Sequence, residues 1–266
     1  MRAQTKALAA ALAAALAFTG LQPAAAADAS ALVGLEEAEY AIDSDNDGLP
    51  DDWETEGVVL HDGTELALPD WGVDPNRPDL FLQLNWMEEH NGKSFAPSAE
   101  ALQDIVDLFD DHGIALHIDA GETYSNIPNY TEFHGGETVA YSQHYFADQI
   151  SGVRLLKDIE TYLGDRSNAF RLGIIGDQID RADYTTGVAL VGDSAFFVAN
   201  NDQIDSNEQL RNAILHEFGH TLGLRHNGAA DVTRKLPRTQ ATPVEYLSVM
   251  NYDHQFTHFN YSEEAY

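Results

Sequence analysis

The chain has 266 residues, of which 44% are hydrophobic and 10% aromatic, and it contains no cysteine. This composition supports one packed domain with a small appendage and excludes global disorder. With 44 acidic residues against 14 basic ones and a formal net charge of -30, the protein repels nucleic acid and anionic lipid, so we expect neither as a partner. Because the chain cannot form disulfides, we expect bound metal ions to cross-link its segments instead.

Residues 1–27 have the pattern of a secretory signal peptide. A basic start (Arg2 and Lys6) precedes an apolar run at 7–21 and an Ala-x-Ala cleavage site that ends at Ala27. The run is shorter than the roughly 18 to 20 residues that span a bilayer, which disfavours the alternative of a membrane anchor. We therefore expect a secreted, extracellular protein that has no membrane partner.

Residues 43–54 form a dense acidic loop within an N-terminal segment, 28–75. Acidic residues and one glycine occupy positions 1, 3, 5, 6, 9 and 12 of this window, which is the ligand spacing of a calcium loop. The predicted calcium ligands are Asp43, Asp45, Asp47, Leu49 through its carbonyl, Asp51 and Glu54. Pro50 departs from an EF-hand, and the form resembles the calcium repeats of secreted bacterial proteins. The alternative is an ordinary acidic linker.

The main domain is predicted over residues 76–266, and a proline-rich stretch, 68–78, is expected to connect into it. An alternating strand at 80–86, a helix capped by Ser98 and a second alternating strand at 114–118 follow. Together they predict a strand-helix-strand unit with parallel pairing and a right-handed crossover.

Residues 120–150 are polar and aperiodic, which predicts a long surface loop. His134 and His144 lie in it. They can hold a second metal with nearby carboxylates, although two loop histidines are more often simply exposed. The elements expected after this loop are a helix at 155–163, a strand at 170–174 and a hairpin of strands at 188–191 and 195–198.

A long helix is predicted to begin after Ser206, which starts a capping box. Within the segment HEFGHTLGLRH, His216 and His220 are one turn apart on the same side of the helix, so both imidazoles can reach one ion. His226 can be the third ligand only if the chain turns after the helix. Gly223 is placed for that turn, because glycine adopts a left-handed conformation without a Cβ clash.

Glu217 lies beside the first of these histidines. A glutamate there can take a proton from a zinc-bound water and later pass it to a leaving amine. The alternative is a surface helix that happens to carry histidines. We favour the zinc site because the five matching positions also fit one geometry.

The segment resembles the zinc motif of the metzincin peptidases, and Ser248-Val249-Met250-Asn251-Tyr252 resembles their methionine turn. The resemblance implies an α/β domain with a twisted, mostly parallel sheet, an active-site helix and a small C-terminal subdomain. It implies a structural Met250 beneath the metal. As in astacins and serralysins, Tyr252 would bind zinc or stabilise the oxyanion, the alternative being a buried tyrosine. Few residues follow Met250, so the usual C-terminal helix is expected to be short or missing.

The expected function is that of a secreted zinc endopeptidase that acts on a protein or peptide substrate and uses zinc and calcium. An extended peptide would pair with an exposed edge strand, expected at 188–191. Two rivals remain: a calcium-stabilised, catalytically inactive binding or adhesion module, and a peptidase restricted to one protein partner. The sequence does not specify the substrate, the subfamily or the oligomeric state. It also does not show whether residues 28–75 inhibit the enzyme.

Overall fold

The computed structural model describes residues 41–147, 149–181, 185–226 and 246–263. The predicted signal peptide lies outside the described residues. Within the described ranges, no helix combines the length and the apolar character that crossing a membrane requires.

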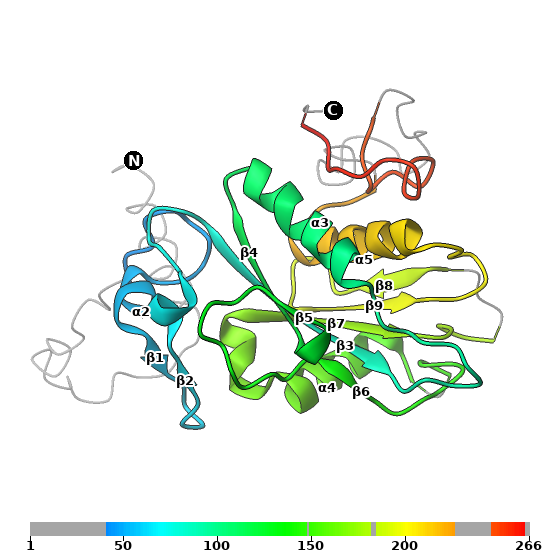
Figure 1. The fold of residues 1–266 in the computed structure, drawn as a ribbon, viewed down its shortest axis with the longest axis horizontal. Coiled ribbons are helices and arrows are strands. Elements are labelled where there is room, and N and C mark those ends of the chain that lie inside the picture. The colour runs from blue at the N-terminus through cyan, green and yellow to red at the C-terminus, as the bar shows by residue number, and fades with distance from the viewer. Residues whose placement is uncertain (1–40, 148, 182–184, 227–245, 264–266) are drawn as a thin grey trace, which may run out of the picture. The chain divides into compact units, whose positions relative to one another are not determined.

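A mixed, mostly parallel sheet of seven strands forms the centre of the domain (Figure 1). The strands are β3 (Asp79–Met87), β4 (Ala115–Ala120), β5 (Tyr124–Ser125), β6 (Gly136–Val139), β7 (Phe170–Gly176), β8 (Gly187–Ala189) and β9 (Ala195–Ala199). Their order is β5-β4-β3-β7-β9-β8, and β6 pairs with the end of β3. The central pairs are parallel, whereas β5 and β8 lie antiparallel at the two edges. The predicted parallel unit and the later hairpin are therefore confirmed.

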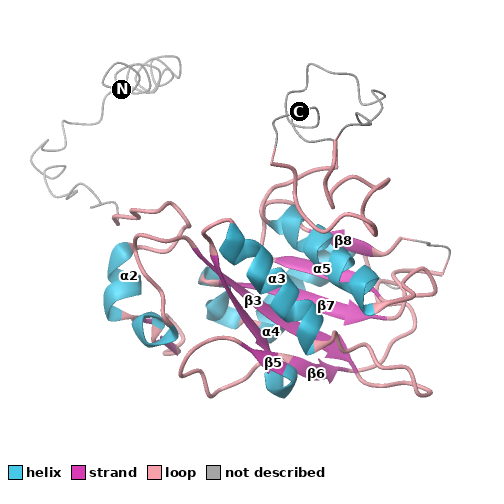
Figure 2. Ribbon diagram, turned by 45° about the horizontal axis from the view of Figure 1, so that its top comes forward, coloured by secondary structure: helices cyan, strands magenta, loops and turns pink. Residues whose placement is uncertain are grey.

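Three long helices cover the two faces of this sheet (Figure 2). They are α3 (Ala99–Asp111), α4 (Ser151–Tyr162) and α5 (Asn207–Thr221). Successive residues of β9 show which helix lies on which face. The Phe196 ring packs against Phe218 of α5, whereas the Phe197 ring stacks on Tyr145, whose hydroxyl bonds Asp158 of α4. The two helices α3 and α5 lie side by side, with an ion pair between Asp104 and Arg211.

Two helices begin at the serines that the sequence predicts as caps. Ser98 Oγ accepts a hydrogen bond from the Ala101 N–H at 3.2 Å, and Ser206 Oγ accepts one from the Gln209 N–H at 3.3 Å. The Gln209 side chain in turn accepts from the N–H of Asp205. These bonds satisfy N–H groups that have no partner inside a helix.

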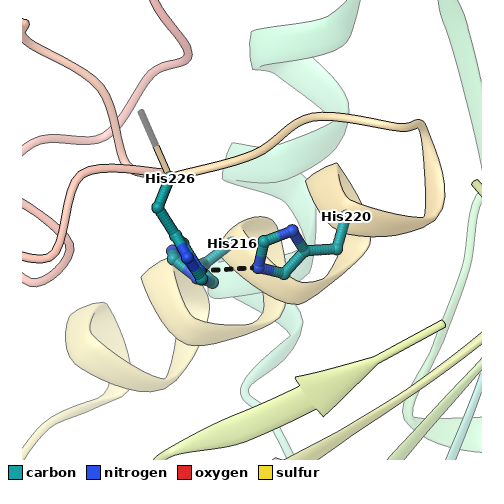
Figure 3. Close-up of side chains that lie close together, drawn as sticks. All are labelled: His216, His220 and His226. Atoms are coloured by element: carbon teal, nitrogen blue, oxygen red, sulfur yellow. Dashed lines mark hydrogen bonds between the residues drawn. The ribbon is translucent and has the colours of Figure 1, made fainter. Parts of the chain in front are cut away.

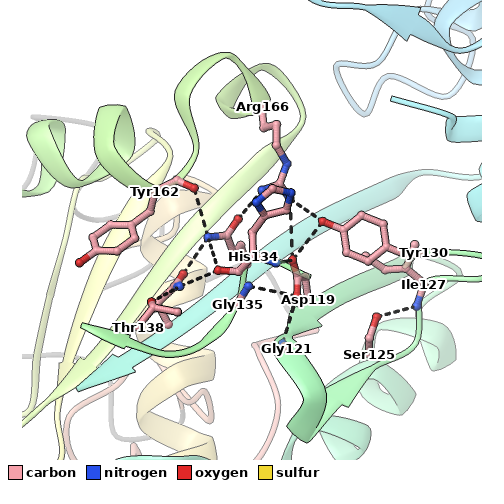
Figure 4. Close-up of polar contacts among 12 residues, drawn as sticks. Asp119, Gly121, Ser125, Ile127, Tyr130, His134, Gly135, Thr138, Tyr162 and Arg166 are labelled. Carbon is pink, nitrogen blue, oxygen red and sulfur yellow. Dashed lines mark hydrogen bonds and ion pairs between the residues drawn. The ribbon is translucent and has the colours of Figure 1, made fainter. Parts of the chain in front are cut away.

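The prediction of one long surface loop at 120–150 is wrong in part, because this segment contains two short strands, β5 and β6. The cause is a buried polar network at the sheet (Figure 4). The Asp119 carboxylate accepts hydrogen bonds from the N–H groups of His134 and Gly135, and Asn85 of β3 donates to the His134 carbonyl. A Cβ on Gly135 would lie 2.3 Å from the Asp119 carbonyl oxygen, so the loop packs directly on the strand.

The acidic N-terminal segment packs into the same core as the sheet. Its elements are α2 (Asp51–Glu56), β1 (Val58–Val59), β2 (Glu65–Leu66) and the 3-10 turn η2 (Leu68–Trp71). The Trp71 ring lies 5.9 Å from Phe81 of β3 and 6.1 Å from Phe170 of β7. The proline-rich stretch therefore packs on the sheet as well as connecting to it, and residues from Ala41 onward belong to one compact unit.

Beyond Met250, residues 251–263 form turns. These turns are bonded back to α5. The Asn212 side chain donates to the Gln255 carbonyl at 2.9 Å, and the Tyr261 hydroxyl donates to the Leu215 carbonyl at 2.7 Å. The described C-terminal residues therefore pack on α5, the helix that carries His216 and His220.

Candidate active site

Three histidine rings converge at the end of α5 (Figure 3). The Nε2 atom of His226 lies 3.2 Å from Nε2 of His216 and 2.9 Å from Nε2 of His220. Three imidazole nitrogens this close together form a donor set that suits one zinc ion. The sequence predicted these three residues as ligands, and the structure brings them together.

His226 reaches the group because the helix stops and the chain folds back. The last helical residue is Thr221, and Gly223 then takes φ of 91°. The N–H of Leu224 bonds back to the Gly219 carbonyl at 3.0 Å, closing the turn. Nothing lies near the position of a Cβ on Gly223, so it is the left-handed backbone that favours glycine there.

Backbone carbonyls hold two of the rings in orientation. His216 Nδ1 lies 2.8 Å from the Val249 carbonyl oxygen, and His220 Nδ1 lies 2.8 Å from that of Leu224. A proton on each Nδ1 leaves the Nε2 lone pair free for a metal. Burial lowers the pKa of His216 to about 3 and also lowers that of His220, so both rings are neutral near pH 7.

Glu217 lies beside the histidines in an almost closed environment. It is 4% exposed, and its Oε1 is 4.0 Å from His216 Nε2. In the described part of the chain its Oε2 has no hydrogen-bond partner, and burial raises its pKa to about 8. A buried carboxylate without a partner, next to three convergent nitrogens, is what a zinc site with an acid-base residue would contain, so these residues fit the metal.

Gly187, the first residue of edge strand β8, limits the space around this carboxylate. A Cβ at this position would lie 2.3 Å from Glu217 Oε1 and 2.5 Å from its Cδ and Cγ. Sequence reasoning missed this residue, because a glycine at the start of a short strand carries no signal about a helix thirty positions away.

Met250 and Tyr252 lie on either side of the histidines. Met250 is fully buried, and its Sδ would be 2.7 Å from a Cβ on Gly219, so it packs directly against α5 between the two helical histidines. Tyr252 is 66% exposed, with its ring 4.1 Å from that of His226. Partial desolvation of its hydroxyl beside the histidines, together with the nearby carboxylate of Glu217, raises the pKa of Tyr252, so the hydroxyl keeps its proton at neutral pH.

The acidic loop brings together most of its predicted ligands. Carboxylate oxygens of Asp43, Asp45 and Asp47 lie within 4.8 Å of one another. Asp51 does not join them: it accepts hydrogen bonds from the N–H and the hydroxyl of Ser44. Leu49 is buried beside the loop, and its N–H donates to the Asp47 carboxylate.

Asp79 forms a second acidic group with Asp47 and Glu54. Sequence reasoning missed it, because it lies outside the loop pattern. The available signal was weak: a carboxylate that directly precedes the apolar run of a buried strand.

His134 and His144 do not come together as metal ligands in the described chain. The pKa of His134 is lowered by burial and by the positive charge of Arg166, and a cation beside a histidine disfavours a second cation. The backbone of His144 forms a bridge with Gln178. The structure gives no support to a second metal site at this place.

The mixed α/β architecture, with its mostly parallel sheet and its histidine-bearing helix, is consistent with a metzincin-like domain. A family described as Met-zincin matches residues 200–264, which contain α5, the three histidines and the Met250 turn. No curated protein matches the chain. Among solved structures, a chain described as "Structure of a chaperone-substrate complex" matches with 17% identity and a TM-score of 0.33, over 57% of this chain and 24% of that one. The present chain thus spans about a quarter of that match.

Proposed function

We propose that the protein is a secreted zinc endopeptidase. One observation carries the proposal: the three Nε2 atoms of His216, His220 and His226 converge beside the buried, unpartnered Oε2 of Glu217. The Met-zincin match over the same residues supports it. Export is proposed from the signal-peptide pattern of residues 1–27.

The three histidines would hold the metal, and Glu217 would move the proton. When bound, zinc supplies a Lewis acid for the scissile carbonyl and acidifies the attacking water. Glu217 Oε2 accepts the proton of that water and delivers it to the leaving amine. Without a metal, burial raises the pKa of Glu217 to about 8, and a zinc ion beside it would lower this pKa so that the carboxylate can accept a proton near neutral pH. An extended substrate would pair with the side of β8 that faces away from β9, where no other described strand pairs; the first residue of β8 lies against Glu217.

The test is hydrolysis of casein or a peptide library by the purified chain. We expect cleavage that o-phenanthroline abolishes and added zinc restores, because this nitrogen chelator prefers zinc to calcium. The experiment should keep calcium at millimolar concentration throughout, so that loss of activity reports zinc alone. A fully zinc-loaded chain that cleaves nothing in the library would contradict the proposal and would favour the inactive binding module.

Tyr252 is proposed to stabilise the oxyanion. Changing Tyr252 to Phe removes only the hydroxyl, and the ring still packs on His226. We expect kcat to fall by about 10- to 1,000-fold with little change in KM, because the bond forms only in the transition state. Steady-state kinetics at equal zinc content measures this. An unchanged kcat would leave Tyr252 with a packing role only.

We also propose that the loop at 43–54 binds calcium. The oxygens of Asp43, Asp45 and Asp47 already lie close together, and carboxylate oxygens are the ligands that Ca²⁺ prefers. Asp51 accepts hydrogen bonds from the N–H and the hydroxyl of Ser44 and stays a proposed ligand of the loop.

A further inference from the structure

The acidic loop contacts the sheet at Asp79, a carboxylate that lies outside the calcium-loop pattern of residues 43–54. The N–H of Asp79, the first residue of β3, donates to Asp47 Oδ2 at 2.6 Å. Oxygens of Asp47, Glu54 and Asp79 lie within 4.8 Å of one another, and Asp47 also belongs to the group with Asp43 and Asp45. Asp47 therefore links the carboxylates of the loop to that of the strand.

The buried carboxylate of Glu54 indicates that this group binds a ligand. It lies on α2 and is 1% exposed, and neither of its carboxylate oxygens has a hydrogen-bond partner among the described residues. The Oδ2 atom of Asp45 is buried and unpartnered as well. Burial, together with the charges of Asp47 and Asp45, raises the pKa of Glu54 to about 8. A buried carboxylate is strongly unfavourable unless a proton or a cation compensates it.

The nitrogen-bearing side chains near this group leave the Glu54 oxygens without a hydrogen-bond partner among the described residues. His117 Nε2 lies 2.5 Å from Asp79 Oδ1, and the buried guanidinium of Arg171 is electrostatically coupled to Asp47. Neither residue contacts the oxygens of Glu54. A donor set made only of carboxylate oxygens suits a hard divalent cation such as Ca²⁺. A cavity of 170 Å³ lined by Asp47 and Asp79 borders the group.

We propose that Asp79 completes the calcium site of the acidic loop, so that one bound Ca²⁺ ties residues 43–54 to the start of β3. The inference rests on the proposed calcium binding by the loop and adds to it a ligand from the sheet. Because β3 is the strand to which β4, β6 and β7 all pair, the ion would fasten the N-terminal segment to the centre of the domain, in a chain that has no disulfide.

The first test is a calcium titration by calorimetry on the zinc-loaded full chain. We expect Asp79→Asn and Glu54→Gln each to weaken calcium binding by about 10-fold or more, because calcium affinity depends on the number of charged ligands. Glu56→Gln is the matched control, since Glu56 is an exposed glutamate on the same helix. Wild-type chain that binds no calcium would overturn both the loop site and the shared site. Equal affinities of wild type and Asp79→Asn would overturn the shared site alone.

Thermal unfolding separates ion binding from packing. In EGTA at neutral pH, Glu54→Gln should melt above wild type, because the raised pKa of Glu54 forces wild type to take up a proton on folding and glutamine avoids that cost. In millimolar Ca²⁺ it should melt below wild type, because wild type gains stability from the bound ion. This change of sign is not expected for a side chain that only packs. A Glu54→Gln variant destabilised equally in both conditions would overturn the proposal.

Discussion

Replacing Glu217 with Gln is expected to lower kcat by about 10² to 10⁴-fold while zinc stays bound. Glutamine has nearly the same shape and keeps an oxygen, but it cannot accept the proton of the attacking water. The fold should not suffer, because Glu217 Oε2 has no hydrogen-bond partner among the described residues that the change would remove. The measurement is steady-state peptide hydrolysis on protein of known zinc content.

The control for this experiment is the stability of the metal-free chain. Because the pKa of Glu217 is raised to about 8, folding of the metal-free chain at neutral pH must protonate it. Glutamine avoids that cost, so the melting temperature should be unchanged or higher. Wild-type turnover in a zinc-loaded Glu217→Gln variant would rule out proton transfer by this residue. Loss of zinc in the same variant would instead show that Glu217 holds the site together.

His220→Ala is expected to abolish activity by a different route, through loss of the metal. Removing a partner that is merely hydrogen-bonded to a metal ligand typically costs about 10- to 100-fold in affinity, so removing a ligand should cost more than 100-fold. After dialysis against a weak chelator, elemental analysis should find almost no zinc in this variant.

His254→Ala is the matched control for His220→Ala. His254 follows the Met250 turn and is not part of the converging group, so its replacement should leave zinc near one ion per chain. Full zinc occupancy in His220→Ala, or equal loss in both variants, would contradict the assignment of His220 as a ligand.

The zinc centre was predictable from sequence because its geometry is local. One helical turn sets the spacing of His216 and His220, and Gly223 encodes the turn that returns His226. The parallel sheet was predictable for a similar reason, since alternating apolar runs and a capped helix define each unit. These features depend on neighbours a few residues apart, where periodicity carries the information.

The features of the fold and of the sites that could not be predicted from the sequence depend on contacts between segments that are distant in the chain. β6 forms because Asp119 binds the backbone of His134 and Gly135, and no periodicity in a polar segment records that. The approach of Gly187 to Glu217 and of Asp79 to Glu54 likewise joins separate elements. A residue pattern shows the ligands of one loop or helix, and the partner from another strand becomes visible only in the folded chain.

The bonds from the C-terminal turns to α5 have a consequence for biosynthesis. The seven strands of the described sheet all precede α5 in the chain, so they are synthesised before the helix that carries His216 and His220. The carbonyl that orients His216 belongs to Val249, and Tyr261 bonds to α5 later still. A nascent chain that has emerged only to residue 248 therefore has its sheet but lacks the acceptor that sets the tautomer of its first zinc ligand. The orientation of His216 therefore depends on residues that are synthesised after α5 itself.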